Sequence, residues 1–148
     1  MRRFVMLLLF LAVAAGLLAA RRRFVVVQVA GTSMVPTYQP GDRVLLRRGG
    51  RVTLRRGQVV VFRRVQPDGA RSSGRDLRGT EWLIKRIAAT PGDGVPAEVA
   101  ARVQAGPDDV VPAGRLVVLG DGPISRDSRH WGYLPVNEVL GVVVRRLS

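Results

Sequence analysis

The sequence contains no cysteine, one histidine, His130, and one lysine, Lys85, among its 24 basic residues. Without cysteine, neither a disulfide nor a thiolate metal site can form. A single histidine cannot supply the several imidazoles on which histidine-built metal sites depend. We therefore expect no metal and no cofactor.

Acidic residues are also scarce, since 11 Asp and Glu face the 24 basic residues and leave a formal net charge of +13. Such a charge predicts attraction either to nucleic acid or to anionic lipid surfaces. The 148 residues, 47% of them hydrophobic, suffice for one globular domain with a core and are few for two. We expect one such domain.

The longest uncharged run lies at the N-terminus, where residues 4–20 read FVMLLLFLAVAAGLLAA. Arg2 and Arg3 precede it and Arg21 to Arg23 follow it, and its length is near the low end of the roughly 17 to 25 residues that span a bilayer as a helix. We interpret residues 1–23 as a membrane anchor with basic flanks. Membrane lipids then explain the positive charge, and no specific binding of nucleic acid is expected.

A cleavable signal peptide is the alternative interpretation of this segment, because it has a basic start and ends in the small residues Ala19 and Ala20. Three arginines directly after the cleavage point argue against it. The two flanks carry too similar a number of arginines for the positive-inside rule to determine the orientation of the anchor.

Residues 24–148 show short runs of Val, Ile and Leu separated by Gly, Pro and Asp, which predicts a mostly β domain. Residues 65–80 are polar and glycine-rich, typical of an exposed loop, and residues 94–114 form a second irregular connection with a possible short helix at 96–103. The expected strands lie within residues 24–31, 42–48, 57–64, 81–89, 114–121 and 139–147.

Ser33, in VAGTSMVPTYQPGDRVLL, follows one expected strand and precedes a Gly-Asp turn. A serine hydroxyl becomes a good nucleophile only when a base removes its proton. His130 is one candidate base, in a Ser-His-Asp triad, and Lys85 is the other, because lysine can lose its proton when desolvated whereas arginine stays charged. Taken singly, Ser33 also fits a turn serine and Lys85 a surface lysine.

In the expected strand WLIKRI, Leu83, Lys85 and Ile87 point to one face. The amine would therefore share its face with two apolar side chains. Burial of this kind disfavours the charged form and lowers the pKa of a lysine toward neutrality, where it can act as a general base.

Three stretches of the chain resemble, in order, the sequence boxes of the type I signal peptidases, membrane-bound Ser-Lys endopeptidases that remove leader sequences. GTSMVPT (31–37), followed by GDRVLL, is similar to the Ser-Met-x-Pro-Thr nucleophile box. IKRIAATPGD (84–93) is similar to the Lys-Arg base box, and Gly-Asp (120–121) followed by SRDSRHWGYLP (125–135) resembles the final box. With the N-terminal segment, the resemblance covers nearly the whole chain.

The resemblance implies a signal-peptidase-like β domain preceded by a single N-terminal transmembrane helix, in the cell membrane with the catalytic domain on its outer face. It implies that Ser33 attacks the scissile carbonyl, that its backbone N–H contributes to the oxyanion hole, that Lys85 is the base, and that Ser125 hydrogen-bonds the lysine amine. The substrates would be precursors bearing signal peptides. It further implies supporting roles for Asp127, Arg129 and Asp121, with Met34 and Pro36 at the substrate, and leaves His130 without an assigned role.

The chain departs from the family pattern at two places. Gly31 stands where some members supply a Ser or Thr hydroxyl to the oxyanion hole, leaving Thr32 as a nearby hydroxyl. Gly122 and Pro123 follow the final Gly-Asp where the family often has Asn and Arg, so the loop carrying Ser125 is expected to be displaced. The inserted β domain of larger members is missing, which indicates a minimal form.

We therefore expect a membrane-anchored serine endopeptidase that cleaves leader peptides. One alternative is a related protease that matures a single precursor, of the nickel superoxide dismutase type. Another is a membrane-anchored basic module that binds without chemistry, which gives no reason for the solitary lysine.

Overall fold

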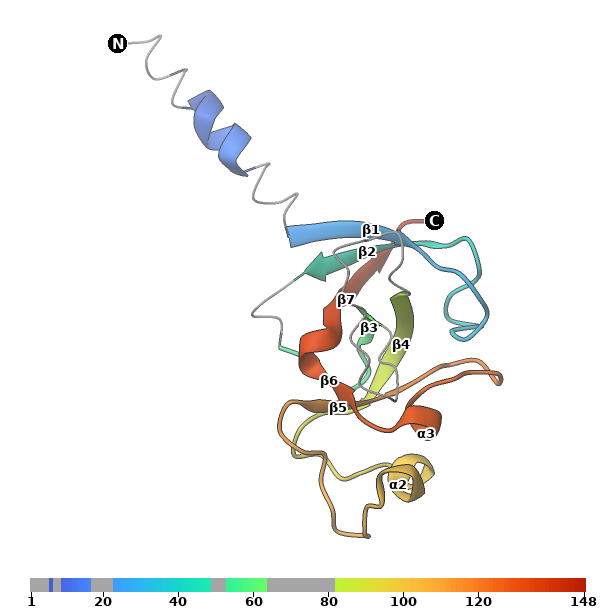
Figure 1. Cartoon of the computed structure of the whole chain (residues 1–148). Coiled ribbons are helices and arrows are strands. Elements are labelled where there is room, and N and C mark those ends of the chain that lie inside the picture. The colour runs from blue at the N-terminus through green and yellow to red at the C-terminus, as the bar shows by residue number, and fades with distance from the viewer. Residues whose placement is uncertain (1–5, 7–8, 17–22, 49–52, 64–81) are drawn as a thin grey trace, which may run out of the picture.

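The computed structural model describes residues 6, 9–16, 23–48, 53–63 and 82–148 of the chain. Seven antiparallel strands form one sheet in the order β1-β2-β7-β3-β4-β5-β6 (Figure 1). The strands are β1 (Phe24–Gln28), β2 (Arg43–Arg48), β3 (Val59–Arg63), β4 (Trp82–Ala89), β5 (Arg115–Leu119), β6 (Leu134–Pro135) and β7 (Val139–Arg146). The helices that follow β1 are α2 (Ala97–Val103), α3 (Ser128–Trp131) and the 3-10 helix η1 (Val136–Glu138).

The predicted mostly β architecture is confirmed, and each of the six expected strands contains one observed strand. The helix expected at 96–103 is α2. The short elements β6 and α3 were not expected, because two to four residues are too few to establish a period of hydrophobicity. The loop expected at 65–80 lies outside the described residues.

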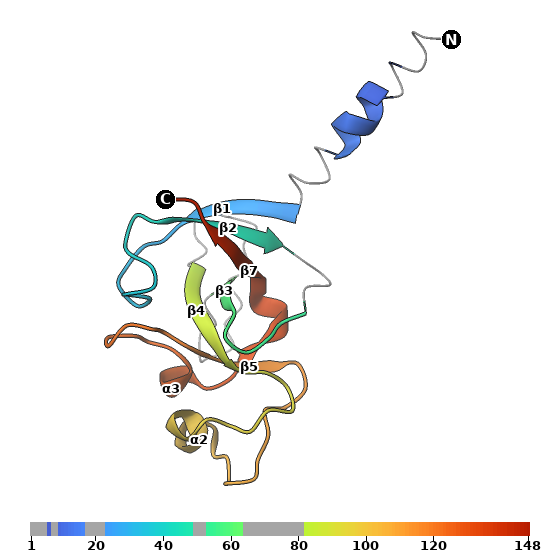
Figure 2. The ribbon, with the colours of Figure 1, turned by 180° about the vertical axis from the view of Figure 1, so that it is seen from behind.

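The sheet curls because its pairing register shifts at three places. Shifts occur between β2 and β7, between β3 and β7, and between β4 and β5. Such irregularities bend a strand and increase its twist. The sheet is therefore curled rather than flat, as the opposite views in Figures 1 and 2 show.

Strand β3 lies at the centre and is buried on both faces. Val60 and Phe62 belong to one apolar cluster, together with Ile87 of β4. Val61, which points the other way, belongs to a second cluster under β1 and β2. A continuous run of valines thus contributes to two cores at once.

A third apolar cluster lies under α2, where Val99 packs with Ala89, Val111 and Val117. It attaches the connection between β4 and β5 to the end of the sheet. In both Figures 1 and 2, α2 lies at the end of the body opposite β1 and β2.

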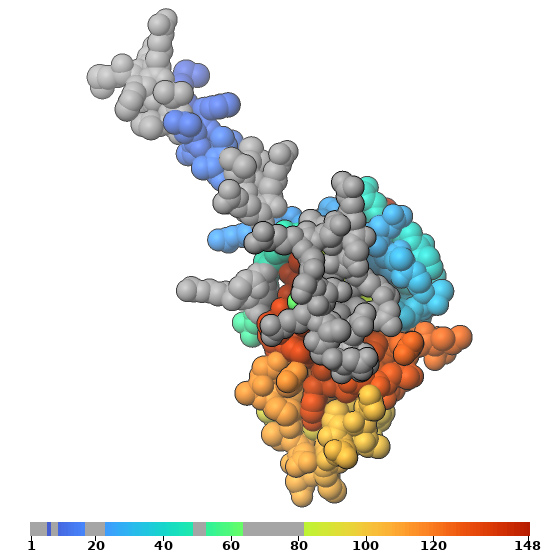
Figure 3. Space-filling model, viewed as in Figure 1, coloured from blue at the N-terminus to red at the C-terminus, as the bar shows by residue number. Residues whose placement is uncertain are grey.

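Residues 9–16 are helical and expose large apolar side chains, Phe10 at 71% among them. This segment stands away from the globular body (Figure 3). Within the described ranges, no helix combines the length and apolar character needed to cross a membrane. The expected anchor at residues 1–23 thus stays a prediction.

Candidate active site

Ser33 lies on the loop that joins β1 to β2, which we call the nucleophile loop. The base of this loop is closed by the Val29 amide donating to the Asp42 carbonyl (2.8 Å) and the Gly41 amide donating to the Val29 carbonyl (2.9 Å). The neighbouring Met34 side chain is fully buried. Closed at its base and anchored at Met34, the loop holds the half-buried Ser33 in a defined place.

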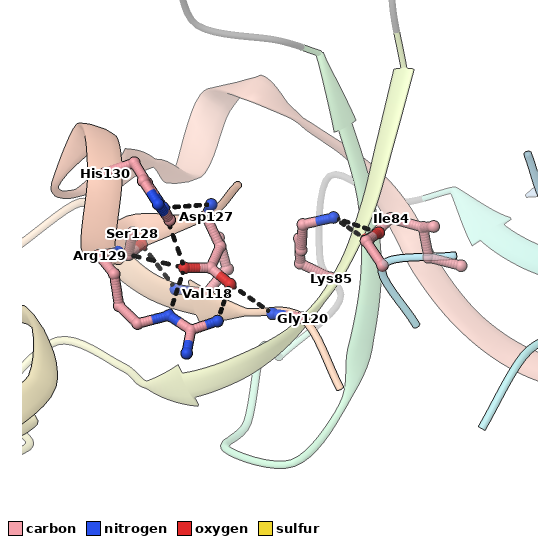
Figure 4. Close-up of polar contacts among 9 residues, drawn as sticks. Ile84, Lys85, Val118, Gly120, Asp127, Ser128, Arg129 and His130 are labelled. Carbon is pink, nitrogen blue, oxygen red and sulfur yellow. Dashed lines mark hydrogen bonds and ion pairs between the residues drawn. The ribbon is translucent and has the colours of Figure 1, made fainter. Parts of the chain in front are cut away.

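Lys85 lies on β4, opposite Val60 of β3, and only 2% of its surface is exposed. The alternation predicted from the sequence is confirmed, since Ile87 belongs to the first apolar cluster and the partly buried Leu83 packs against it. The amine Nζ donates to Ser33 Oγ at 2.6 Å. It also donates to the Ile84 carbonyl at 3.0 Å (Figure 4). The one lysine and Ser33, 52 positions apart in the chain, thus share a hydrogen bond.

The pKa of Lys85 is lowered from its ordinary value, and burial is the main cause. The carboxylates of Asp127 and Asp121 act in the opposite direction, because their negative charge favours the ammonium form. An amine lowered in this way can lose its proton closer to neutral pH and accept one from a neighbouring hydroxyl.

Ser125 differs from the expectation. Its hydroxyl is buried beside the site, but it forms no hydrogen bond to Lys85 and has no partner among the described residues. Gly120 lies between this hydroxyl and the nucleophile loop. A Cβ at Gly120 would collide with Ser125 Oγ and would lie 2.5 Å from the Ser33 carbonyl oxygen, so only glycine fits there.

Asp127 and Arg129 form the expected ion pair. The fully buried Asp127 carboxylate accepts from Arg129 Nη2 at 2.7 Å, from Arg129 Nε at 2.9 Å and from the Gly120 amide at 2.9 Å (Figure 4). Burial alone would raise the pKa of Asp127, but these hydrogen bonds outweigh it and hold the pKa below its usual range. Asp127 also caps α3, where the His130 ring accepts weakly from the Asp127 amide at 3.4 Å.

Asp121 has two partners that the sequence reasoning missed. Arg86 Nε and Nη2 donate to its two oxygens at 2.9 and 2.6 Å, and Thr37 Oγ1 donates at 2.6 Å. The Arg86 hydrogen bonds are the main reason that the pKa of Asp121 is lowered. The sequence did contain a signal for each of these partners, because Arg86 directly follows the candidate base Lys85 and Thr37 ends the Ser-Met-x-Pro-Thr box.

Of the two residues expected at the substrate, Pro36 is exposed, whereas Met34 is fully buried. Met34 therefore supports the nucleophile loop from within, and its contact with the substrate stays a prediction. Gly31 and Thr32 are both exposed beside Ser33, and Gly31 adopts a φ of 81°. Positive φ is the reason that glycine suits this position in the loop.

Gly122 lies in the loop that was expected to be displaced because of the Gly-Pro sequence after Asp121. Its amide donates to the Ser33 carbonyl at 2.9 Å, so the loop after β5 lies directly against the nucleophile loop. A Cβ at Gly122 would lie 2.6 Å from the Thr32 carbonyl oxygen. The glycine that departs from the family pattern is thus the residue that permits this close approach.

Comparison with known proteins gives two findings. The family described as signal peptidase, peptidase S26, matches residues 1–103 and 96–147 of the chain. A protein of Synechocystis sp. described as "Probable signal peptidase I-1" is 29% identical over 144 residues, which covers 84% of this chain and 72% of that protein. The family match at residues 1–103 includes both Ser33 and Lys85.

Proposed function

Because the chain belongs to the peptidase S26 family of signal peptidases, it is a serine peptidase, and we propose that it cleaves leader peptides with a Ser33–Lys85 dyad. The observation that carries this proposal is the 2.6 Å hydrogen bond between the buried Lys85 amine and the Ser33 hydroxyl. A nucleophile and a base within hydrogen-bond reach are the signature of covalent catalysis. A binding module without chemistry would not need this pair.

The proposed reaction has two halves. Neutral Lys85 takes the hydroxyl proton of Ser33 as Oγ attacks the scissile carbonyl carbon, and the resulting ammonium then protonates the leaving amine as the peptide bond breaks. Water next attacks the ester formed on Ser33, with Lys85 again accepting the proton. The leader leaves with a carboxylate, and Ser33 regains its hydrogen.

Negative charge develops on the carbonyl oxygen in both halves. We assign its stabilisation to the backbone N–H of Ser33, because Gly31 offers no hydroxyl for this purpose. The Gly122 amide acts indirectly, because its hydrogen bond to the Ser33 carbonyl helps to hold Ser33 itself in place. Ser125, Asp121, Asp127 and Arg129 act as supporting residues around the dyad.

Substrate binding in this proposal uses the edges of the sheet. In the described part of the chain, β1 pairs only with β2, and residues Trp82–Lys85 of β4 pair only with β3. An extended peptide can hydrogen-bond to such open edges on its way to Ser33. Precursors with small residues at the end of the leader are the expected substrates, and residues 1–23 are the proposed anchor.

The test uses the full chain in detergent with a leader-bearing precursor. We expect Ser33→Ala and Lys85→Arg each to lower kcat/KM by at least about 10³-fold, because arginine keeps the charge but cannot give up its proton. Cleavage by the unchanged chain should rise with pH as Lys85 deprotonates, with a midpoint below the ordinary lysine value of about 10.4.

Arg102→Met, which removes an exposed cation on α2, is the matched control and should leave cleavage intact. Circular dichroism and thermal melting check that the inactive variants are folded. Full activity in both Ser33→Ala and Lys85→Arg would disprove the dyad. Offering several unrelated leaders then distinguishes a general signal peptidase from a protease dedicated to one precursor.

A further inference from the structure

The end of β7 lies beside the point where the nucleophile loop enters β2. In the register of these two strands, Arg146 is the partner of Val44. Just beyond this pair, the Leu147 amide donates to the Arg43 carbonyl at 2.7 Å, and the Arg43 amide donates to the Ser148 carbonyl at 2.9 Å. Figures 1 and 2 show β7 ending close to the start of β2. These contacts fix the backbone that carries Arg146 next to the loop.

The two arginines at the end of β7 lie on opposite faces of the sheet. Cross-strand partners share a face. Arg146 therefore shares the face of Val44, which is fully buried, whereas Arg145 shares the face of Leu45. Of the two guanidinium groups, only that of Arg146 lies on the inner face, from which it reaches the nucleophile loop.

The side chain of Arg146 meets Asp42, at the end of the nucleophile loop. Arg146 Nη2 donates to Asp42 Oδ1 at 2.9 Å, and Asp42 is only 8% exposed. Arg146 Nη1 also makes a long contact of 3.5 Å with the Thr37 carbonyl oxygen, in the middle of the loop. A buried carboxylate without a partner is costly, so the Asp42 side chain favours the place where the guanidinium neutralises it.

Asp42 in turn connects the two arms of the nucleophile loop. Its second oxygen, Oδ2, accepts from the Gln39 amide at 2.8 Å, and its own amide donates to the Gln39 carbonyl at 3.1 Å. Its carbonyl accepts from the Val29 amide at 2.8 Å. Val29 precedes Ser33 and Gln39 follows it. A cation that fixes Asp42 therefore steadies the chain on both sides of Ser33.

We propose that Arg146 is a positioning residue for Ser33, because it binds Asp42 from β7 and so keeps the nucleophile loop in its reactive position. This inference rests on the proposed function, and it adds a residue outside the sequence boxes, 104 positions from Asp42 along the chain. In the described part of the chain, the Arg146 side chain hydrogen-bonds to the loop and not to the dyad. It acts through the loop alone.

Cleavage kinetics of the full chain in detergent, with a leader-bearing precursor, test this role. Arg146→Met should lower kcat about 10-fold with KM little changed, because a looser loop presents Ser33 in the reactive geometry less often. Arg145→Met removes the same charge from the other face of β7 and should keep full kcat. Arg63→Met removes a 2.7 Å ion pair to Glu138 of similar exposure, away from the loop, and should also keep it.

A double variant separates positioning from the cost of a buried unpaired charge. Arg146→Met alone leaves the Asp42 carboxylate without its cation and should lower Tm. Combining it with Asp42→Asn removes both charges and should recover most of the Tm, since the asparagine oxygen can still accept from the Gln39 amide. The connection to β7 stays broken, so kcat should stay low. Recovery of kcat together with Tm would show that the ion pair serves stability alone and would overturn the proposal.

Hydrogen exchange follows the loop without any substrate. In Arg146→Met, we expect the amides of residues 29–42 to exchange about 10-fold faster while those of β3 and β5 are unchanged. Ser33→Ala should exchange like the unchanged chain, so this measurement decides the positioning role even if the chain cleaves no leader. Unchanged exchange in the loop, an equal rise throughout the sheet, or an equal loss of kcat in the two control variants would overturn the proposal.

Discussion

At the scale of single residues, the site depends on glycines as much as on the dyad. Gly120 and Gly122 flank Asp121 and let the chain after β5 touch the nucleophile loop at two points. Neither has a positive φ, so the reason for glycine is space and not backbone conformation. A Cβ at Gly120 would lie 2.5 Å from the Ser33 carbonyl oxygen, and one at Gly122 would lie 2.6 Å from the Thr32 carbonyl oxygen. Backbone carbonyls cannot rotate away as a side chain can.

Gly122→Ala is therefore expected to displace the nucleophile loop. A Cβ only 2.6 Å from the Thr32 carbonyl forces the two segments apart, and small displacements of a nucleophile lower kcat by as much as about 100-fold. We expect kcat for leader cleavage to fall about 10- to 100-fold with KM little changed. Steady-state kinetics over a range of substrate concentrations measure kcat and KM separately.

Gly94→Ala is the matched control, because Gly94 also lacks a positive φ and has open space where its Cβ would lie. It should leave kcat unchanged. If Gly122→Ala retains full kcat, the close contact does not position Ser33. A parallel fall in Gly94→Ala would point to a general effect of the substitution.

At the scale of elements, the nucleophile loop is held by two hydrogen bonds to the chain after β5. The Gly122 amide holds Ser33, and the Thr37 hydroxyl donates to Asp121, which is itself paired with Arg86 of β4. Because Arg86 is the neighbour of Lys85, this network links the loop carrying the nucleophile to the strand carrying the base. The relative position of the loop and β4 therefore sets the distance between Ser33 and Lys85.

Thr37→Val removes only the hydroxyl that joins the loop to Asp121. We expect a stability loss of about 1 kcal/mol, because the hydrogen bond is exposed, together with a fall in kcat as the loop loosens. Thermal melting and cleavage kinetics measure the two effects separately.

Thr90→Val offers a close comparison, since Thr90 Oγ1 donates to Asp93 at 2.8 Å in the turn after β4. It should lower stability similarly and leave kcat intact. Equal losses of kcat in the two variants would show that stability, and not the loop connection, limits activity.

At the scale of the whole molecule, paired carboxylates tie stability to pH. Asp93, Asp121 and Asp127 all have pKa values below the usual range, each through hydrogen bonds. Their stabilising contribution is present above the unfolded value of about 3.9 and is lost as pH falls through the lower folded values, because the unfolded chain then binds more protons.

We therefore expect Tm to change little from about pH 7 to pH 5 and to fall steeply below about pH 4. Calorimetry in detergent across this range measures the profile. Asp93→Asn, which removes one of these carboxylates away from the dyad, should make the acid slope shallower. A Tm that stays level below the ordinary aspartate value would contradict the assignment of these groups as stabilising.

The local features of the protein were determined by sequence alone. Alternating apolar residues predicted the strands and the buried side of Lys85, since neighbouring side chains in a strand point to opposite faces whatever the fold. The solitary lysine and the ordered boxes predicted the serine and its base. These patterns involve only a few consecutive residues, so they can be recognised without knowledge of the fold.

Only the tertiary structure decided how distant segments meet. That Lys85 donates to Ser33 and Ile84 rather than to Ser125, that Arg86 and Thr37 share Asp121, and that Gly122 touches the nucleophile loop all depend on how the curled sheet brings separate loops together. Apart from the Lys85–Ile84 contact, these join residues from 35 to 89 positions apart in the chain. No local period or composition encodes them, because their geometry arises only when the strands have paired.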